Sequence, residues 1–304
     1  MILVVGATGL VGSEVCRRLA AAGMRARALV RDTADPAKVQ ALRELGLDIA
    51  TGDVRDPASL GEACQGVSDL ICTLSSMPFS YVAGENDIAT TDREGVLRLV
   101  DVARRSGVDH FVYTSFSSNI DLQFPLRDAK RTVEAYLKLS GLSYTILRPS
   151  YFMEVWLSPA VGFDAANATA TVYGDGTRPI SWISLADVAA FAVASLNNPA
   201  ARNATFELGG PAALSPNEVV ATFEGLAGRP FSVQSVPAET LAAQQADSRD
   251  AMAQSFAGLM RCYARGDAID MAATLRALPI TLTTVREYAA RTLGVAPTQA
   301  AGVA

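Results

Sequence analysis

The sequence predicts an α/β protein built on a doubly wound parallel sheet. Short apolar segments recur along the first half of the chain, and segments with apolar residues at helical spacing lie between them. A glycine-rich stretch, VVGATGLVGS, includes the end of the first apolar segment and leads into a segment of helical character. Regular alternation of strands and helices favours parallel pairing, because each helix returns the chain to the same end of the sheet.

The first half of the chain contains six strand candidates, at residues 2–5, 26–30, 48–51, 70–74, 110–115 and 143–147. Helices are predicted between them at 13–22, 36–45, 58–64, 87–105 and 128–139. In a doubly wound fold the ligand crevice lies beyond the carboxyl ends of the strands. The residues that end each predicted strand are therefore the first candidates for a functional site.

The alternation becomes less regular after residue 150. We expect further strands at 180–183 and 205–208, and helices at 185–196, 216–226, 239–265 and 283–293. Ser184 and Asp187 fit a capping pattern for the helix that begins at residue 185, so Asp187 is interpreted as structural. The predicted organisation is a dinucleotide-binding domain over 1–150, a substrate-binding portion over 151–295 that shares the sheet, and a disordered tail over 296–304.

Composition and charge argue against several classes of protein. About half of the residues are apolar, the formal net charge is −5, and no basic tract is interleaved with aromatic residues, so no nucleic-acid partner is expected. The N-terminus lacks a signal-peptide pattern and no segment has 18 consecutive apolar residues, which predicts a cytoplasmic protein without a membrane partner. The four cysteines are scattered and His110, the only histidine, begins an apolar segment, so no metal site is expected. Either a monomer or a homodimer is compatible with the sequence.

The glycine-rich stretch has the spacing of a dinucleotide-binding turn. A residue without Cβ lets the backbone turn tightly and approach a diphosphate, and the N-terminus of the following helix directs unpaired N–H groups at the anion. Glycine triplets also occur by chance in ordinary turns, so the stretch requires support from other strand ends. The residues expected at the diphosphate are Gly6, Thr8, Gly9, Leu10, Val11 and Gly12.

The ends of the later strands supply that support. Arg31, at the end of the second strand, favours NADP(H) over NAD(H), because a guanidinium can bind the 2′-phosphate in two hydrogen bonds. Asp32 is the contrary signal, since an acidic residue there would bind the 2′-hydroxyl of NAD. The other residues expected along the cofactor are Asp53, Val54, Thr73, Leu74, Ser75, Lys130 and Pro149.

Several segments together resemble a known family. In chain order, VVGATGLVG, LVRD, GDVRDP, VYTSF, AKRTVEAYLKLSGLSYTILRPSYFMEVW, ISLADVAAF and FELGGPAALSPNEV are similar to the NmrA-like group of atypical short-chain dehydrogenases/reductases, from residue 1 to about 225. The resemblance implies a Rossmann fold and NADP(H) binding. The group includes NADPH-dependent quinone, isoflavone-type and triphenylmethane-dye reductases, and also regulators that bind dinucleotides without turnover.

The proton-transfer pair of ordinary short-chain reductases, Tyr-x-x-x-Lys, is absent. Leu126 stands four residues before Lys130, and no tyrosine in the chain is followed by lysine at that spacing. By resemblance, Lys130 matches the lysine that isoflavone-type reductases place near the nicotinamide, and Glu134 matches the acid that follows it. There an ammonium would polarise a carbonyl or deliver a proton. The alternative is a helix-surface lysine paired with Glu134.

Ser115 is the second candidate catalytic residue. It ends the fifth predicted strand and matches, by resemblance, the hydroxyl that short-chain reductases direct at the reacting carbonyl. Tyr113 precedes it by two residues and is expected on the same face of that strand. The alternative is that the Ser115 hydroxyl only satisfies neighbouring backbone groups.

Large apolar side chains follow three of the strand ends and are candidates for a substrate pocket. They are Met77 and Phe79 after the fourth strand, Phe116 after the fifth, and Tyr151, Phe152 and Trp156 after the sixth. Such walls suit a flat apolar or aromatic acceptor better than a nucleotide sugar. The alternative for each is ordinary core packing, which is also the favoured interpretation of the helically spaced Met252, Phe256, Met260 and Tyr263.

The sequence therefore predicts an NADPH-dependent oxidoreductase that transfers hydride to an apolar or aromatic carbonyl, quinone or enone. Two alternatives stay open. One is an NADP(H)-sensing regulator of the NmrA type without turnover, and the other is a nucleotide-sugar epimerase or dehydratase, which normally requires the absent Tyr-x-x-x-Lys pair.

Overall fold

The computed structural model describes residues 1–78 and 80–296. Residue Phe79, expected in the substrate pocket, lies outside the described residues. The same holds for the predicted disordered tail beyond residue 296.

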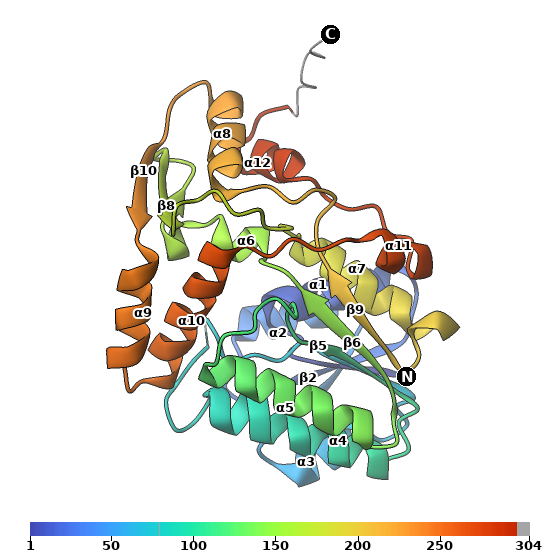
Figure 1. The fold of residues 1–304 in the computed structure, drawn as a ribbon. Coiled ribbons are helices and arrows are strands. Elements are labelled where there is room, and N and C mark those ends of the chain that lie inside the picture. The colour runs from blue at the N-terminus through green and yellow to red at the C-terminus, as the bar shows by residue number, and fades with distance from the viewer. Residues whose placement is uncertain (79, 297–304) are drawn as a thin grey trace.

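A seven-stranded parallel sheet forms the centre of the molecule, in the order β3-β2-β1-β4-β5-β6-β9 (Figure 1). Strand β1 pairs on both sides, so that Ile2 lies opposite Ala26 of β2 and Asp69 of β4. The predicted doubly wound fold is confirmed, and each strand lies within two residues of its predicted bounds. The strands are β1 (Ile2–Val5), β2 (Ala26–Val30), β3 (Asp48–Thr51), β4 (Asp69–Cys72), β5 (His110–Thr114), β6 (Ser143–Pro149) and β9 (Ala204–Leu208).

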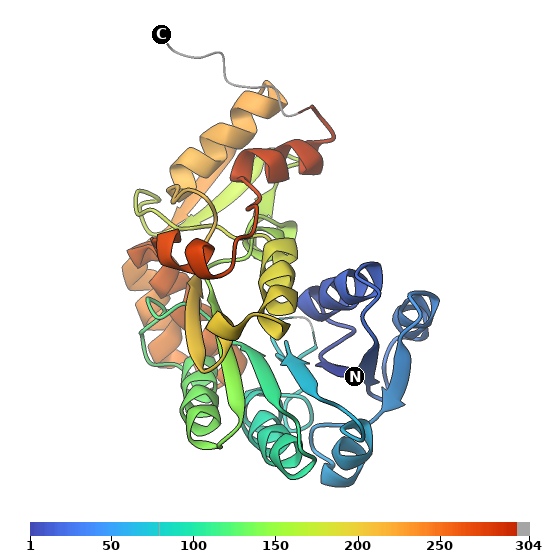
Figure 2. The same ribbon diagram turned by 90° about the vertical axis from the view of Figure 1, so that its right-hand side faces the viewer.

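Helices cover both faces of this sheet (Figure 2). On one face lie α1 (Leu10–Ala21), α2 (Pro36–Glu44) and α7 (Leu185–Leu196). On the other lie α3 (Pro57–Ala63), α4 (Val96–Arg105) and α5 (Pro125–Leu139). Successive residues of a strand point to opposite faces of the sheet. Val112 of β5 packs with the helices on the first face, whereas Phe111 and Tyr113 pack with those on the second.

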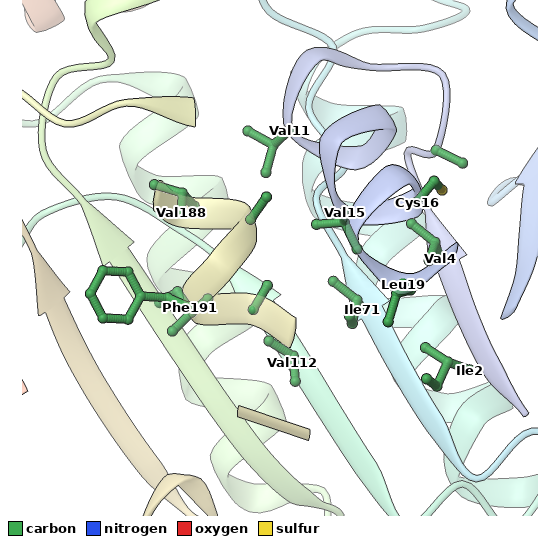
Figure 3. Close-up of a cluster of buried hydrophobic side chains, with 14 of the residues drawn as sticks. Ile2, Val4, Val11, Val15, Cys16, Leu19, Ile71, Val112, Val188 and Phe191 are labelled. Atoms are coloured by element: carbon green, nitrogen blue, oxygen red, sulfur yellow. The ribbon is translucent and has the colours of Figure 1, made fainter. Parts of the chain in front are cut away.

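The core under α1 shows how the sequence pattern produces this packing. Val11, Val15 and Leu19 of α1 face the sheet and α7, which contributes Val188 and Phe191 (Figure 3). Their spacing of three or four residues places them on one side of each helix. The two helices thereby bury a continuous apolar layer over β1, β4 and β5.

His110 has a structural role. Its side chain is fully buried at the start of β5, and its Nε2 lies 2.8 Å from the Thr145 hydroxyl of β6. Burial lowers the pKa of His110 to about 4, aided by the nearby Arg202 charge and opposed by Asp69. The imidazole is therefore neutral at physiological pH and joins two neighbouring strands.

The prediction of one helix over 87–105 is wrong in its first half. Residues Ile88–Gly95 form a π-helix, capped by Asp87 and Thr90 in a reciprocal box, and α4 begins only at Val96. Within this π-helix Asp92 is completely buried. π-helical turns are rare and are frequent at functional sites.

The helix predicted over 239–265 is two helices, α9 (Ala238–Asp247) and α10 (Ala251–Arg265). The polar residues between them explain the break, because Asp250 accepts a hydrogen bond from the Ala253 N–H and the Ser248 hydroxyl accepts one from the Asp250 N–H. The prediction of a strand at 180–183 is also wrong. Ile180 makes isolated bridges to Leu214 and Asp267, and Ile183 makes one to Phe152.

The C-terminal part adds elements that gather beyond the arrowheads of β6 and β9 (Figure 1). A second sheet, absent from the sequence prediction, has the order β10-β8-β7. Its strands are β7 (Phe163–Asp164), β8 (Thr169–Tyr173) and β10 (Ser232–Val236). The remaining α-helices are α6 (Met153–Trp156), α8 (Pro216–Ala227), α11 (Ala272–Ala277) and α12 (Val285–Leu293). Among the described residues, no helix has the length and apolar character to cross a membrane.

Asp187 has the structural role that the sequence indicated, although through a different contact. Ser184 caps α7 by accepting a hydrogen bond from the Ala186 N–H. The Asp187 carboxylate instead accepts two hydrogen bonds from Thr283, one from its N–H at 2.8 Å and one from its hydroxyl at 3.0 Å. Asp187 thus fastens the segment before α12 to the first turn of α7.

The glycine-rich turn between β1 and α1 is fixed by close backbone packing. Gly6 has a φ of +85°, which favours glycine, and a Cβ on Gly12 would lie 2.1 Å from the Gly6 carbonyl oxygen. The first turn of α1 therefore rests directly on the end of β1. Gly9 precedes the helix, and no described side chain caps it.

Gly12→Ala should lower the free energy of unfolding by about 1 to 3 kcal/mol, because the backbone must move to admit the methyl group. Gly225→Ala is the matched control: Gly225 lies inside α8, a Cβ added there would have no neighbouring atom within 4 Å, and alanine should stabilise the helix by about 1 kcal/mol. Urea unfolding measures both. Equal effects of the two substitutions would contradict the close approach of α1 to β1.

Candidate active site

A pocket opens at the carboxyl edge of the main sheet, where the fold predicts a ligand crevice. Polar residues that end or follow β4, β5 and β6 form one side of it, and it encloses about 850 Å³ of space, its open mouth included. The polar residues from these strands are Thr73, Ser75, Thr114, Ser115 and Ser150. The topology therefore brings together side chains that are distant in the sequence.

Lys130 lines this pocket from α5 and is 4% exposed. Its Nζ donates a hydrogen bond to the Leu74 carbonyl oxygen at 2.9 Å and lies 3.6 Å from Asp92 Oδ1. The same nitrogen lies 5.3 Å from the centre of the Tyr113 ring. These three contacts hold the amine at the ends of β4 and β5.

Asp92 is the partner that the sequence analysis missed. Its Oδ2 accepts hydrogen bonds from the Ser76 N–H at 3.0 Å and from the Ser76 hydroxyl at 2.6 Å, which leaves Oδ1 toward Lys130. A signal was present in the sequence, because Asp92 takes an apolar position in the stripe formed by Ile88, Val96 and Leu99. A charged residue on such a stripe requires a buried partner.

The interpretation of Lys130 as a surface residue paired with Glu134 is wrong. Glu134 is also buried, and it forms ion pairs with Arg131 at 2.6 Å and with Arg148 of β6. Burial raises the pKa of Glu134, but hydrogen bonds from Arg148 and Ser115 and the charges of both arginines outweigh it and leave the pKa below its usual value. Glu134 is a carboxylate that joins α5 to β6 behind the pocket.

Ser115 lies on the pocket wall and is 6% exposed. Its N–H donates to the Leu147 carbonyl oxygen, and its hydroxyl lies beside Glu134. Tyr113 is completely buried on the same face of β5, and burial raises its pKa far above the ordinary value. Of these two residues, Ser115 is the one that reaches the pocket.

The opposite side of the pocket is apolar. Five of the predicted substrate residues line it, namely Met77, Phe116, Tyr151, Phe152 and Trp156. The Tyr151 hydroxyl donates to the Leu259 carbonyl oxygen, so the polar end of its ring is already occupied. Residues that the sequence did not assign to the pocket complete the wall: Pro78, Ile120, Leu126, Val155, Phe256 and Leu259.

Among the described residues that line the pocket, Lys130 is the one with a formal charge. A cationic amine and several hydroxyls thus face an apolar wall that includes aromatic rings. This arrangement can polarise one oxygen of a flat apolar ligand while excluding water from the rest of it.

The residues predicted for the adenosine end of the cofactor lie outside this pocket, at the ends of β2 and β3. Arg31 is exposed there. Its positive charge, like that of Arg55, lowers the pKa of Asp53. Asp53 binds Arg55 at 2.7 Å, and this hydrogen bond is the main reason that the pKa of Asp53 is lowered although burial opposes it. Val54 is buried under Gly95, and its carbonyl oxygen accepts from Arg98.

The predicted dinucleotide residues fit an extended anionic ligand. Gly9 and Leu10 are exposed at the start of α1, where uncapped N–H groups and the helix dipole favour a diphosphate. Val11, Thr73, Ser75 and Pro149 continue into the pocket beside Lys130. Leu74 contributes its carbonyl oxygen to Lys130, while its side chain packs in the core.

Comparison with known proteins agrees with this geometry. The model of the NmrA-like family matches residues 1–289. An NAD(P)H azoreductase from Xenophilus azovorans is 32% identical over 86% of this chain and 85% of its own length. A photosystem II assembly factor from Trieres chinensis is 29% identical over 78% of this chain and 72% of its own length.

Solved structures have the same fold. An NADPH-dependent quinone oxidoreductase from Escherichia coli, in complex with NADPH, is 25% identical with a TM-score of 0.78, over 96% of this chain and 99% of its own length. The structural match thus extends over nearly the whole chain.

Lys130→Met should lower the free energy of unfolding by about 3 to 5 kcal/mol, because it leaves the fully buried Asp92 carboxylate without its cation. Adding Asp92→Asn to the same chain should recover about 1 kcal/mol or more, since no uncompensated charge then remains. Urea unfolding of the two single variants and the double variant measures this coupling. If the loss of stability in the double variant equalled the sum of the losses in the two single variants, the ion pair would be contradicted.

Proposed function

The chain belongs to the NmrA-like family, and on this premise we propose that it is an NADPH-dependent reductase of apolar or aromatic carbonyl, quinone or enone compounds. The observation that supports it best is the buried Lys130 amine, which faces an otherwise uncharged pocket at the carboxyl edge of the sheet. The azoreductase and quinone oxidoreductase relatives, whose names include the coenzyme, support the same class of reaction.

The coenzyme would be held along the edge that the strand ends form. In this proposal residues 1–150 bind the dinucleotide and residues 151–295 cover the substrate. The diphosphate would bind at the start of α1, at Gly9 and Leu10, and the 2′-phosphate at Arg31. When bound, the nicotinamide supplies a hydride to an electrophilic carbon.

Lys130 would act on the oxygen or conjugated system of the substrate. Its two fixed contacts, to Leu74 and Asp92, orient the amine and leave its remaining N–H capacity for the ligand. A positive charge held in an apolar, water-poor pocket stabilises developing negative charge on a substrate oxygen. Asp92 is the positioning residue of this amine, and Ser115 would orient the ligand through its hydroxyl.

The apolar wall determines the class of substrate. Phe116, Phe152 and Trp156 present partly exposed rings to the pocket, which suits a planar ligand. A nucleotide sugar would place a second diphosphate in this pocket, and among the described lining residues only Lys130 could neutralise it. This argues against the epimerase or dehydratase alternative, together with the missing Tyr-x-x-x-Lys pair.

A regulator that binds NADP(H) without turnover is the second candidate function. The observation that favours it is the similarity to photosystem II assembly factors, whose names describe no reaction. The two functions differ in one property: a reductase oxidises NADPH when an acceptor is present, whereas a sensor binds NADPH and does not consume it.

Turnover tests the reductase directly. We expect NADPH absorbance to fall in the presence of aromatic quinones or enones, and Lys130→Met/Asp92→Asn to lose about 10²-fold or more in kcat while it still binds NADPH. The double variant is used because it removes both members of the buried ion pair. NADPH binding by the wild-type chain without oxidation by any acceptor in the panel would favour the sensor.

Arg31→Asp tests the cofactor preference. Because the guanidinium is expected at the 2′-phosphate, the substitution should weaken NADPH binding by about tenfold or more and leave NADH binding nearly unchanged. Titration calorimetry with both coenzymes measures this, and Arg17→Asp on the exposed side of α1 controls for the change in net charge. Equal weakening of both coenzymes would contradict the assignment.

A further inference from the structure

Arg131 follows Lys130 on α5 and holds the loop that carries Phe116. Its Nη1 donates a hydrogen bond to the Phe116 carbonyl oxygen at 3.0 Å, and its Nη2 donates one to the Ser117 carbonyl oxygen at 2.6 Å. The same guanidinium lies over the Phe116 ring, with its Cζ atom 5.1 Å from the ring centre. A cation at this distance attracts the face of an aromatic ring. One side chain thus fixes both the backbone and the ring of Phe116.

The guanidinium of Arg131 is itself held in place. The buried Glu134, three residues further along α5, forms an ion pair with Arg131 at 2.6 Å and also binds Arg148 of β6. A planar guanidinium that is bound at both terminal nitrogens keeps little freedom to turn. Arg131 lies outside the lining of the pocket, so it acts there through the residues that it holds.

Phe116 lies where such support matters. It follows β5 in a segment that belongs to neither a helix nor a strand, and its partly exposed side chain lines the pocket. The Phe124 ring packs beside it, with the two ring centres 6.3 Å apart. A ring that was free to turn would lose conformational freedom when a ligand stacked on it. A ring that is held in advance therefore binds the same ligand at a lower entropic cost.

The continuation of this loop is held by a different group. The Ser117 hydroxyl and the Asn119 side-chain amide donate hydrogen bonds to Asp267 Oδ1, at 2.7 Å and 2.8 Å. These contacts fix the loop beyond Phe116. The contacts of Arg131 extend the support to Phe116 itself, at the end of the loop that reaches the pocket.

We propose that Arg131 is a positioning residue that selects planar aromatic acceptors, because it holds the Phe116 ring as a fixed wall of the pocket. This inference rests on the proposed reductase function and narrows its substrate class to fused aromatic quinones over small aliphatic enones. A stacked ring binds a planar ligand equally in the ground state and in the transition state. Loss of the fixed wall should therefore raise KM and leave kcat nearly unchanged.

Arg131→Lys tests the role of the guanidinium without removing its charge. A lysine at this position can still pair with Glu134, but its single ammonium cannot bind two carbonyl oxygens and cover the Phe116 ring as a planar fork does. The measurement is kcat and KM at saturating NADPH, with 9,10-phenanthrenequinone and with 2-cyclohexen-1-one as acceptors. We expect the preference in kcat/KM for the quinone over the enone to fall about threefold to tenfold, through a higher KM for the quinone.

Phe116→Ala shows whether Arg131 acts through the ring. This variant should lose at least as much preference for the quinone as Arg131→Lys, and the double variant should lose no more than Phe116→Ala alone. Losses that multiply in the double variant would overturn the assignment, because Arg131 would then act by another route.

Arg127→Lys is the matched control on the same helix. Arg127 lies one turn before Arg131, pairs with its neighbour Asp128 at 2.8 Å, and lies outside the lining of the pocket. The substitution makes the same chemical change and keeps the same charge. The preference for the quinone should stay at the wild-type value, and a loss equal to that of Arg131→Lys would overturn the role of Arg131.

Quenching of tryptophan fluorescence by phenanthrenequinone measures binding without turnover, because Trp156 lines the pocket. Arg131→Lys should weaken this binding by about the same factor as it raises KM, while Tm stays near wild type. A wild-type chain that oxidises NADPH, with kcat/KM for both acceptors lowered equally in Arg131→Lys or with an unchanged preference, overturns the inference alone. A wild-type chain that binds NADPH but oxidises it with no acceptor overturns the proposed function, and with it the selection of acceptors.

Discussion

The shared direction of the strands is the constraint on which the rest of the structure depends. In a parallel sheet the carboxyl ends of β4, β5 and β6 open at one edge, whatever the sequence between them. Ser75, Ser115 and Ser150 therefore meet in one pocket although they lie in three different loops. The close contact of Gly12 with Gly6 sets α1 against the same edge and leaves its N-terminus open for an anion. Backbone geometry alone thus places the uncapped N-terminus of α1 next to the pocket.

The buried ion pair between Lys130 and Asp92 adds a charged group to the pocket, which the backbone alone does not supply. Removing both charges from water is expensive, and an apolar pair of similar size would stabilise the fold equally well or better. The pair is therefore better explained by what it does in the pocket than by stability. Asp92 lies within the π-helix, where Ser76 holds one carboxylate oxygen and leaves the other toward the amine.

The main sheet could be predicted because each of its strands is a local apolar pattern between helical segments. Lys130 and Ser115 could be placed at its edge for the same reason, since each lies on or next to an element of that pattern. The second sheet could not be predicted: β7 has only two residues, and β10 pairs with β8 across more than fifty residues of intervening chain. Asp92 was missed although its place on an apolar stripe was a signal, because its partners Lys130 and Ser76 are set by the tertiary structure. The break between α9 and α10 was missed because Ser248 and Asp250 compete with the helix through their own side chains.

The two buried acids Asp92 and Asp267 have opposite surroundings. Asp92 faces the Lys130 amine at 3.6 Å, an arrangement that holds the amine in place. Asp267 accepts hydrogen bonds at Oδ1 from two neutral donors, Ser117 and Asn119, and burial together with the nearby Glu207 carboxylate raises its pKa. A group that stabilises negative charge developing on a ligand must itself carry positive charge, and a neighbouring carboxylate favours that charge whereas a neutral acid does not. The side of the pocket at which Asp92 holds Lys130 is therefore the side suited to polarise a ligand oxygen.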